Sequence, residues 1–208
     1  MLGSHAHASH TFKQKLVARR KTLCITGAAA LVFVAVVNDD SIIVTDARAA
    51  DTFSSNVDEQ GNISFPEGFR TSMVHMGSWF VPEGGASGFH DVYTEPETVE
   101  AYRKTGEFPD GATLVKELRA SVSGDFTTGS GVSHATDGLK QWFVMIKDSE
   151  NRFEDNPLWG DGWGWALFKP GETATNAASD YKADCLGCHV PAKDTDWVYT
   201  QAYPILAE

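Results

Sequence analysis

The feature that most constrains this chain is a short run near its C-terminal end, CLGCH at residues 185–189. Two thiols separated by two residues can add across the two vinyl groups on one edge of a porphyrin. The histidine that follows can then bind the iron. The spacing therefore predicts one covalently attached haem c per chain, held through Cys185 and Cys188, with His189 as the iron ligand.

Two other uses of a cysteine pair fit this sequence less well. A small redox disulfide does not require the adjacent histidine, and a zinc site needs a second pair of ligands. The histidines outside the motif that fall in the main part of the chain stand alone at His75, His90 and His134. The third cysteine, Cys24, lies far from the motif, inside an apolar segment.

The first fifty residues have the pattern of an export signal rather than of a folded domain. A basic stretch at 13–21 precedes an uncharged apolar run at 22–37, and an Ala-Arg-Ala triplet follows at 47–49. We expect cleavage near Ala49 or Ala50, a periplasmic location, and one haem domain over 51–208. Because the segment before the triplet is long, an uncleaved anchor is the alternative, although 16 apolar residues are short for a bilayer span.

Charge restricts the partners. The chain carries 17 basic and 28 acidic side chains, and residues 51–208 hold 11 and 25 of these, which leaves a strongly acidic domain. Such a surface repels phosphate backbones and anionic membranes. Nucleic acid is therefore not an expected partner, whereas small neutral molecules and basic proteins are compatible with this charge.

The pattern of the domain is mostly that of strands, which argues against a four-helix cytochrome with long amphipathic helices. Short apolar or alternating segments occur at 72–81, 89–94, 113–122, 139–146 and 163–168. Helical signals are limited to 97–104, behind a proline, and to 173–188, which leads into the cysteine motif. The sequence predicts an α+β fold with a five-stranded antiparallel β-sheet flanked by a few helices, and a C-terminal haem-binding helix.

One charged residue lies where the pattern predicts an apolar face. In the strand at 113–122, alternation places Lys116 beside Leu114 and Leu118. An ammonium at such a position must reach water, pair with a carboxylate, or take part in chemistry. A lysine that protects a sheet edge or extends past its leucines to solvent is the alternative interpretation.

With these residues in view, the chain resembles the cytochrome P-460 family and its close relatives, the cytochromes c′-beta. The matching segments follow in order over nearly all of the domain: 65–70, 76–79, 91–93, 101–111, 114–118, 144–148 and 185–206, the last including DWVYT at 196–200. The resemblance implies a five-stranded antiparallel sheet with flanking helices, a homodimer, and one haem per subunit.

The resemblance also gives Lys116 a role. In the P-460 branch a lysine within the segment matching 114–118 bonds to a carbon of the porphyrin, and Lys116 is its counterpart. The c′-beta branch lacks that lysine and binds gases. The family implies an iron with His189 as its one protein ligand and an open opposite position, and for the P-460 branch the substrate is hydroxylamine.

The chain departs from the most active family members at its expected distal residues. Where they carry an arginine, this chain has His90, and the sequence does not locate their distal carboxylate. His90 is a candidate proton acceptor because imidazole titrates near neutrality, with a hydrogen-bonded sheet residue as the alternative. Phe89 is assigned to the distal wall of the haem site, with core packing as the alternative.

Three functions follow from this reasoning. The first is a hydroxylamine-oxidising enzyme that passes electrons to a soluble cytochrome. The second is a protein that binds or detoxifies nitric oxide, and the third is a simple electron carrier. Lys116 favours the first over the second, and the absence of an assignable second axial ligand counts against the third.

Overall fold

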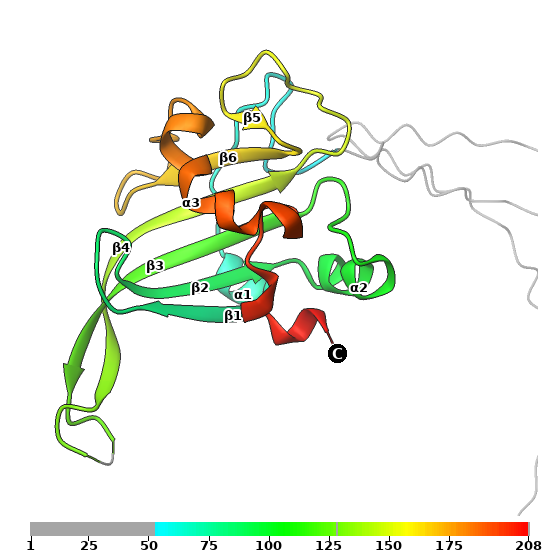
Figure 1. Cartoon of the computed structure of the whole chain (residues 1–208). Coiled ribbons are helices and arrows are strands. Elements are labelled where there is room, and N and C mark those ends of the chain that lie inside the picture. Colours follow the sequence, from blue (N-terminus) through cyan, green and yellow to red (C-terminus); the bar gives the residue numbers. More distant parts are fainter. Residues whose placement is uncertain (1–52, 128, 208) are drawn as a thin grey trace, which may run out of the picture. The chain divides into compact units, whose positions relative to one another are not determined.

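The computed structural model describes residues 53–127 and 129–207. Their centre is a single antiparallel sheet of six strands in the order β1-β2-β3-β4-β6-β5 (Figure 1). The predicted export signal at 1–50 lies outside the described residues. Among the described helices, none is long and apolar enough to cross a membrane.

The elements are short apart from the two central strands. In chain order they are α1 (Phe69–Ser72), β1 (Val74–Val81), β2 (Gly88–Thr94), α2 (Pro96–Thr105), β3 (Thr113–Gly124), β4 (Ser133–Lys147), β5 (Trp159–Gly160), β6 (Trp163–Phe168), the π-helical turn η1 (Lys182–Leu186), α3 (Gly187–His189), and the 3₁₀ turns η2 (Val190–Thr195), η3 (Thr200–Ala202) and η4 (Pro204–Leu206).

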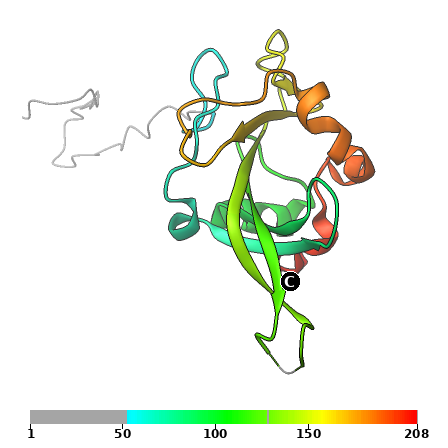
Figure 2. The same cartoon turned by 90° about the vertical axis from the view of Figure 1, so that its left-hand side faces the viewer.

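Strands β3 and β4 form the middle of the sheet and continue beyond it. Register places Lys116 of β3 between Val92 of β2 and Phe143 of β4. The far ends of β3 and β4 project from the body as a long hairpin (Figures 1 and 2). The predicted strand at 139–146 is therefore the body half of a longer strand.

Each face of the sheet buries its own hydrophobic cluster. One face carries Val115 and Val144 and packs against the N-terminal segment, including Phe69 of α1. The other face carries Leu114 and Met145 and packs against the C-terminal segment that contains the cysteine motif. The motif thus covers the face on which alternation placed Lys116.

The predicted number of strands was wrong by one. Residues 159–160 form β5, which pairs with β6 through a two-residue turn at Asp161 and Gly162. Both turn residues have positive φ, 54° and 81°, as a tight type I′ hairpin requires, and Asp-Gly is a strong signal for that turn. The sheet therefore has six strands rather than five.

The helix predicted over 173–188 was wrong for its first half, because 173–180 follows the edge of β6 in an irregular conformation. The Asn176 amide oxygen accepts the N–H of Leu167 and that of Ala178, and its nitrogen donates to the Trp165 carbonyl. Helical turns begin only around Tyr181, where Asp180 accepts the N–H of Lys182. The Asn side chain thus holds this segment against the sheet.

Candidate functional site

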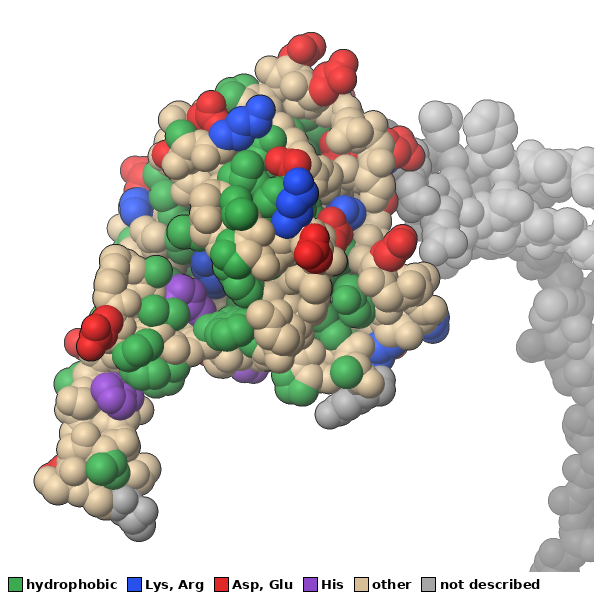
Figure 3. All heavy atoms as spheres, in the orientation of Figure 1, with side chains coloured by type: hydrophobic (Ala, Val, Ile, Leu, Met, Phe, Trp, Pro, Cys, Tyr) green, Lys and Arg blue, Asp and Glu red, His purple; other side chains and the backbone are tan. Residues whose placement is uncertain are grey.

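A cavity of about 750 Å³ lies between the sheet and the C-terminal segment. The sheet contributes His90 of β2, Lys116 of β3 and Phe143 of β4, and the covering segment contributes the two cysteines and His189. Its volume is that of a typical cofactor site. Figure 3 shows hydrophobic side chains gathered over the middle of the molecule, with acidic side chains mainly around them.

The cysteine pair is arranged for covalent attachment. Cys185 is buried and Cys188 exposed, both are free thiols, and they lie on successive helical turns, η1 and α3. Burial raises the pKa of the Cys185 thiol to about 11, so it is a neutral thiol at pH 7. Among the described residues, no group of three or more His, Cys, Asp or Glu side chains forms an alternative metal site.

His189 is held as a neutral imidazole with one free ring nitrogen. Its Nδ1 lies 2.7 Å from the carbonyl oxygen of Trp197, which only accepts, so Nδ1 carries the proton and Nε2 keeps its lone pair. Burial lowers the pKa of His189 to about 4. The Trp165 ring packs edge-on against the imidazole at 4.9 Å between centroids. The imidazole is therefore oriented, and it is unprotonated across the neutral pH range.

The residues fit a haem c. Two thiols, an adjacent imidazole with a free Nε2 and a mostly apolar cavity are the donor set that this cofactor needs. The Trp79 indole N–H, which also lines the cavity, is buried and makes no hydrogen bond of normal geometry among the described residues. Burial raises the pKa of Tyr203, and the nearby Trp79 indole opposes that rise. A polar group of a cofactor in the cavity could accept a hydrogen bond from this buried indole N–H.

Lys116 faces this cavity without a carboxylate partner among the described residues. Its Nζ lies 4.1 Å from the centroid of the Phe143 ring, and its side chain is enclosed by protein except toward the cavity. Burial lowers the pKa of Lys116 to about 8, and the nearby thiols of Cys188 and Cys185 oppose that shift. Because Lys116 lies on a central strand, it is not an edge lysine. Its side chain is half-buried and lines the cavity, so the alternative of a lysine that reaches solvent stays open.

His90 lies on the same face, two residues along the strands from the row of Lys116. It is 8% exposed, and its Nε2 is 2.6 Å from the carbonyl oxygen of Ala86. Burial lowers the pKa of His90, and Lys116 and Lys140 lower it further. Because Nε2 must carry the proton, Nδ1 of the neutral ring is the free acceptor.

The loop that contains Ala86 closes one side of the cavity. Besides the His90 contact, the Lys140 ammonium donates to the carbonyls of Gly85 and Ser87 at 3.2 and 2.9 Å. Gly85 and Ala86 line the cavity. Sequence reasoning did not find this wall, because it depends on Lys140 from a strand far along the chain.

Gln141 and Lys169 are two polar residues of the cavity that sequence reasoning missed. The Lys169 ammonium donates to Gln141 Oε1 at 2.5 Å. Because an ammonium has no acceptor, this contact fixes the amide orientation and leaves the Gln141 NH₂ as a donor. Period-two alternation with Phe143 could have identified Gln141, whereas Lys169 lies beyond the end of β6 and gave no signal.

Phe89 is the one predicted site residue that the structure does not bring to the cavity. It follows the alternation of β2 and lies on the face opposite His90, where its ring packs 4.9 Å from that of Phe80. It is not among the described residues that line the cavity. Phe89 is half-buried and belongs to neither of the two buried clusters, so it is also not a core residue.

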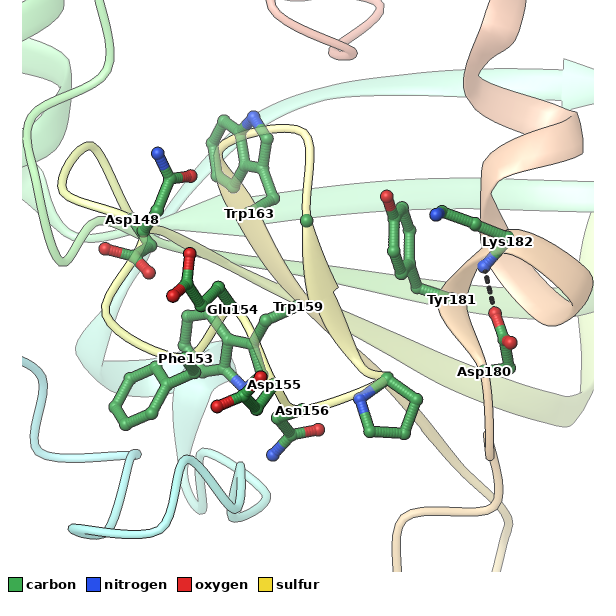
Figure 4. Close-up of a pocket in the computed structure, with 13 residues that line it drawn as sticks. Asp148, Phe153, Glu154, Asp155, Asn156, Trp159, Trp163, Asp180, Tyr181 and Lys182 are labelled. Atoms are coloured by element: carbon green, nitrogen blue, oxygen red, sulfur yellow. Dashed lines mark hydrogen bonds between the residues drawn. The ribbon is translucent and has the colours of Figure 1, made fainter.

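A second cavity, of about 520 Å³, lies at the β5–β6 end of the molecule (Figure 4). Aromatic rings such as Trp159 and Trp163 line it, with carboxylates that include Asp148, Glu154 and Asp180. Tyr181 lines this second cavity, and its ring stacks on that of Trp165, which lines the first. None of the predicted site residues lines this second cavity.

Comparison with known proteins gives one family. The family model described as Cytochrome P460 matches residues 66–200, a range that includes all six strands, Lys116 and the cysteine motif. No curated protein matches the chain.

Proposed function

The chain belongs to the cytochrome P460 family, whose members are haem c proteins, and from this premise we propose that it oxidises hydroxylamine. The proposed cofactor is one haem per chain, attached through Cys185 and Cys188, with His189 as axial ligand and a further bond to Lys116. The observation that carries the proposal is the position of Lys116, a partly neutral amine that faces the cavity opposite the cysteine motif.

When bound, the haem supplies an iron with an open position for a small nitrogenous ligand and a route for its electrons. Met145 and His90 both line the cavity. Met145 also packs in the buried cluster that contains Leu114, and the Nε2 of His90 is held by the Ala86 carbonyl, so we propose that neither binds the iron. Such a site favours ligand chemistry over simple electron transfer.

The environment of Lys116 favours bond formation to carbon. A nucleophilic amine must be neutral, and with a pKa of about 8 roughly one amine in ten is neutral at pH 7, against about one in three thousand for an ordinary lysine. Formation of this bond would replace a ring C–H by C–N and release two electrons and two protons, which an added oxidant such as a peroxide would take up. The bond would also remove an unpaired ammonium from a mostly apolar cavity. Both effects support the assignment of Lys116 as the crosslinking residue.

His90 and Gln141 supply the polar chemistry of the cavity. Oxidation of hydroxylamine releases protons with electrons, so a base beside the ligand accelerates it. His90 can accept a proton at Nδ1 without losing its hydrogen bond to Ala86. The Gln141 NH₂ can donate to a ligand oxygen.

A second candidate function is nitric oxide binding, as in the c′-beta branch. The observation that favours it is the lack of a free carboxylate in the cavity. Among the described residues, Asp184 is the only carboxylate that lines it, and its Oδ2 accepts the N–H groups of Ser179 and Asp180. Without a carboxylate base, proton removal depends on His90 alone.

Turnover of hydroxylamine by haem-loaded protein tests the proposal. We expect the wild type to oxidise hydroxylamine with an artificial electron acceptor. Lys116→Leu should fold, since leucine suits the face of Leu114 and Leu118, keep its haem through the thioethers, and bind nitric oxide. It should lose hydroxylamine oxidation and show an ordinary c-type spectrum.

Lys104→Leu is the matched control, because Lys104 is exposed on α2 and does not line the cavity. Its turnover and spectrum should equal those of the wild type. A wild-type protein that binds nitric oxide but does not turn over hydroxylamine would place the gas-binding function first.

A further inference from the structure

The backbone adopts an unusual conformation just after the cysteine motif. Asp196 and Trp197 are consecutive residues in the left-handed region, with φ of 57° and 64°. This region is unfavourable for residues with a Cβ, and a bulky tryptophan rarely adopts it. Among the described residues, no other two adjacent non-glycine residues have positive φ. The surrounding structure must therefore hold this turn in place.

Two residues of the sheet hold the turn through Asp196. The Lys147 ammonium, from the end of β4, lies 2.9 Å from the carboxylate. The indole N–H of the fully buried Trp163, from β6, donates to the Asp196 carbonyl at 3.0 Å and to its Oδ1 at 3.2 Å. Lys147 also lies over the Trp163 ring, 5.0 Å from its centroid. The Asp196 turn is thus fixed to two strands of the sheet.

The turn presents one group to the site. Its next carbonyl, that of Trp197, is the acceptor 2.7 Å from His189 Nδ1. The Trp197 N–H donates back to Ala192 at 2.9 Å, so the peptide groups on both sides of this residue are oriented. Lys147, Trp163 and Asp196 therefore act on the imidazole through one backbone carbonyl.

We propose that Asp196, anchored by Lys147 and Trp163, is a positioning residue that sets how strongly His189 binds the haem iron. The proposal rests on His189 as the axial ligand and not on any particular substrate. A carbonyl held firmly in line with Nδ1–H increases the basicity of Nε2, which strengthens the bond to iron and stabilises the ferric state. The chain adopts the unfavourable conformation at Asp196 and Trp197 because that conformation points the Trp197 carbonyl at His189.

Three variants of the haem-loaded protein separate the contributions of the Asp196 side chain, its charge and its ion pair with Lys147. Asp196→Gly removes the side-chain anchors while glycine adopts the positive φ without penalty. Lys147→Met removes the ion pair and keeps an apolar stem over Trp163. Asp196→Asn keeps the size of the side chain and loses its charge. Asp194→Asn is the control, because Asp194 is exposed in η2 and makes no side-chain hydrogen bond among the described residues.

The readouts are the iron–histidine stretching frequency of the ferrous protein, by resonance Raman spectroscopy, and the midpoint potential. We expect a lower frequency and a higher potential in Asp196→Gly and Lys147→Met, a smaller shift of the same sign in Asp196→Asn, and none in Asp194→Asn. Values equal to wild type in both Asp196→Gly and Lys147→Met would overturn the proposal. Neither readout requires hydroxylamine turnover, so a result that overturns the role of Asp196 can be told apart from a result that overturns the proposed function.

Discussion

Lys116 and Glu117 are neighbours on β3, and their side chains lie on opposite faces of the sheet in different surroundings. Lys116 faces the cavity and has no carboxylate partner among the described residues. Glu117 faces the other side, where it accepts hydrogen bonds from Arg119 at 2.6 Å and Trp142 at 3.0 Å and from Arg70. Alternation of the strand thus places an amine that lines the cavity and a carboxylate that is paired on the opposite face one residue apart.

The pH dependence of turnover should report His90. A base must be unprotonated to act, so activity should fall as pH drops through the pKa of His90, which burial places below its ordinary value. His90→Gln keeps a donor for the Ala86 carbonyl but cannot take up a proton. We expect it to lose about 100-fold in turnover and to lack the acidic limb of the profile.

His75→Gln is the control for this prediction, since His75 is an exposed histidine on β1 that pairs with Asp91 outside the cavity. Its pH profile should match that of the wild type. An acidic limb that persists unchanged in His90→Gln would show that another group is the base.

At the scale of elements, sequence patterns predicted most of the strands. They did not predict the features that depend on contacts between residues far apart in the sequence. Short apolar runs located β1, β2 and β6, and alternation located β3, all nearly to their ends. Alternation also placed Lys116 on the correct face. The sequence patterns missed the extension of β4 into the projecting hairpin, because that part of the strand contains few apolar residues. They also placed the start of the C-terminal helix too early, because Asn176 holds the preceding segment against β6. They also missed the hydrogen bond between Lys169 and Gln141 and the loop at 85–87 that Lys140 holds beside the cavity, since these contacts form only in the folded chain.

Glu117 links three elements, and its removal should destabilise the fold without changing the cavity. Burial alone would raise the pKa of Glu117, but hydrogen bonds from Arg119, Arg70 and Trp142 lower it. Its contribution to stability is therefore present above the ordinary glutamate pKa and lost as pH falls through the lower folded value. Glu117→Gln should lower the free energy of unfolding by about 1–2 kcal/mol at pH 7, since both arginines are partly exposed.

Urea unfolding at pH 7 and pH 3.5 measures this effect. The difference between Glu117→Gln and the wild type should shrink at the lower pH, and the haem spectrum should not change. Glu100→Gln, an exposed position on α2, should match the wild type at both pH values. An equal difference at both pH values would contradict the ionic role of Glu117.

At the scale of the whole molecule, charge and the expected export signal determine which partners the protein meets. Residues 51–208 carry 25 acidic and 11 basic side chains, so a soluble cytochrome with a basic surface is the expected electron acceptor. A homodimer and a periplasmic location remain predictions from the resemblance and from the first fifty residues.

N-terminal sequencing of the protein isolated from its host tests the export prediction. The basic and apolar segments before residues 47–49 predict a periplasmic protein that begins near Ala50 or Asp51. Intact Met1 in a soluble cytoplasmic fraction would contradict export. Intact Met1 in the membrane fraction would support the uncleaved anchor.

The most direct test of the account is mass spectrometry of a proteolytic digest of the native haem-loaded protein. If Lys116 is bonded to the porphyrin, its peptide and the peptide containing 185–189 must appear as one species joined through haem, and the absorption spectrum must be shifted to the red. We predict that species in the wild type and its absence in Lys116→Leu. A wild-type digest with haem on the cysteine peptide and a free Lys116 peptide would contradict the crosslink and, with it, the assignment to hydroxylamine oxidation.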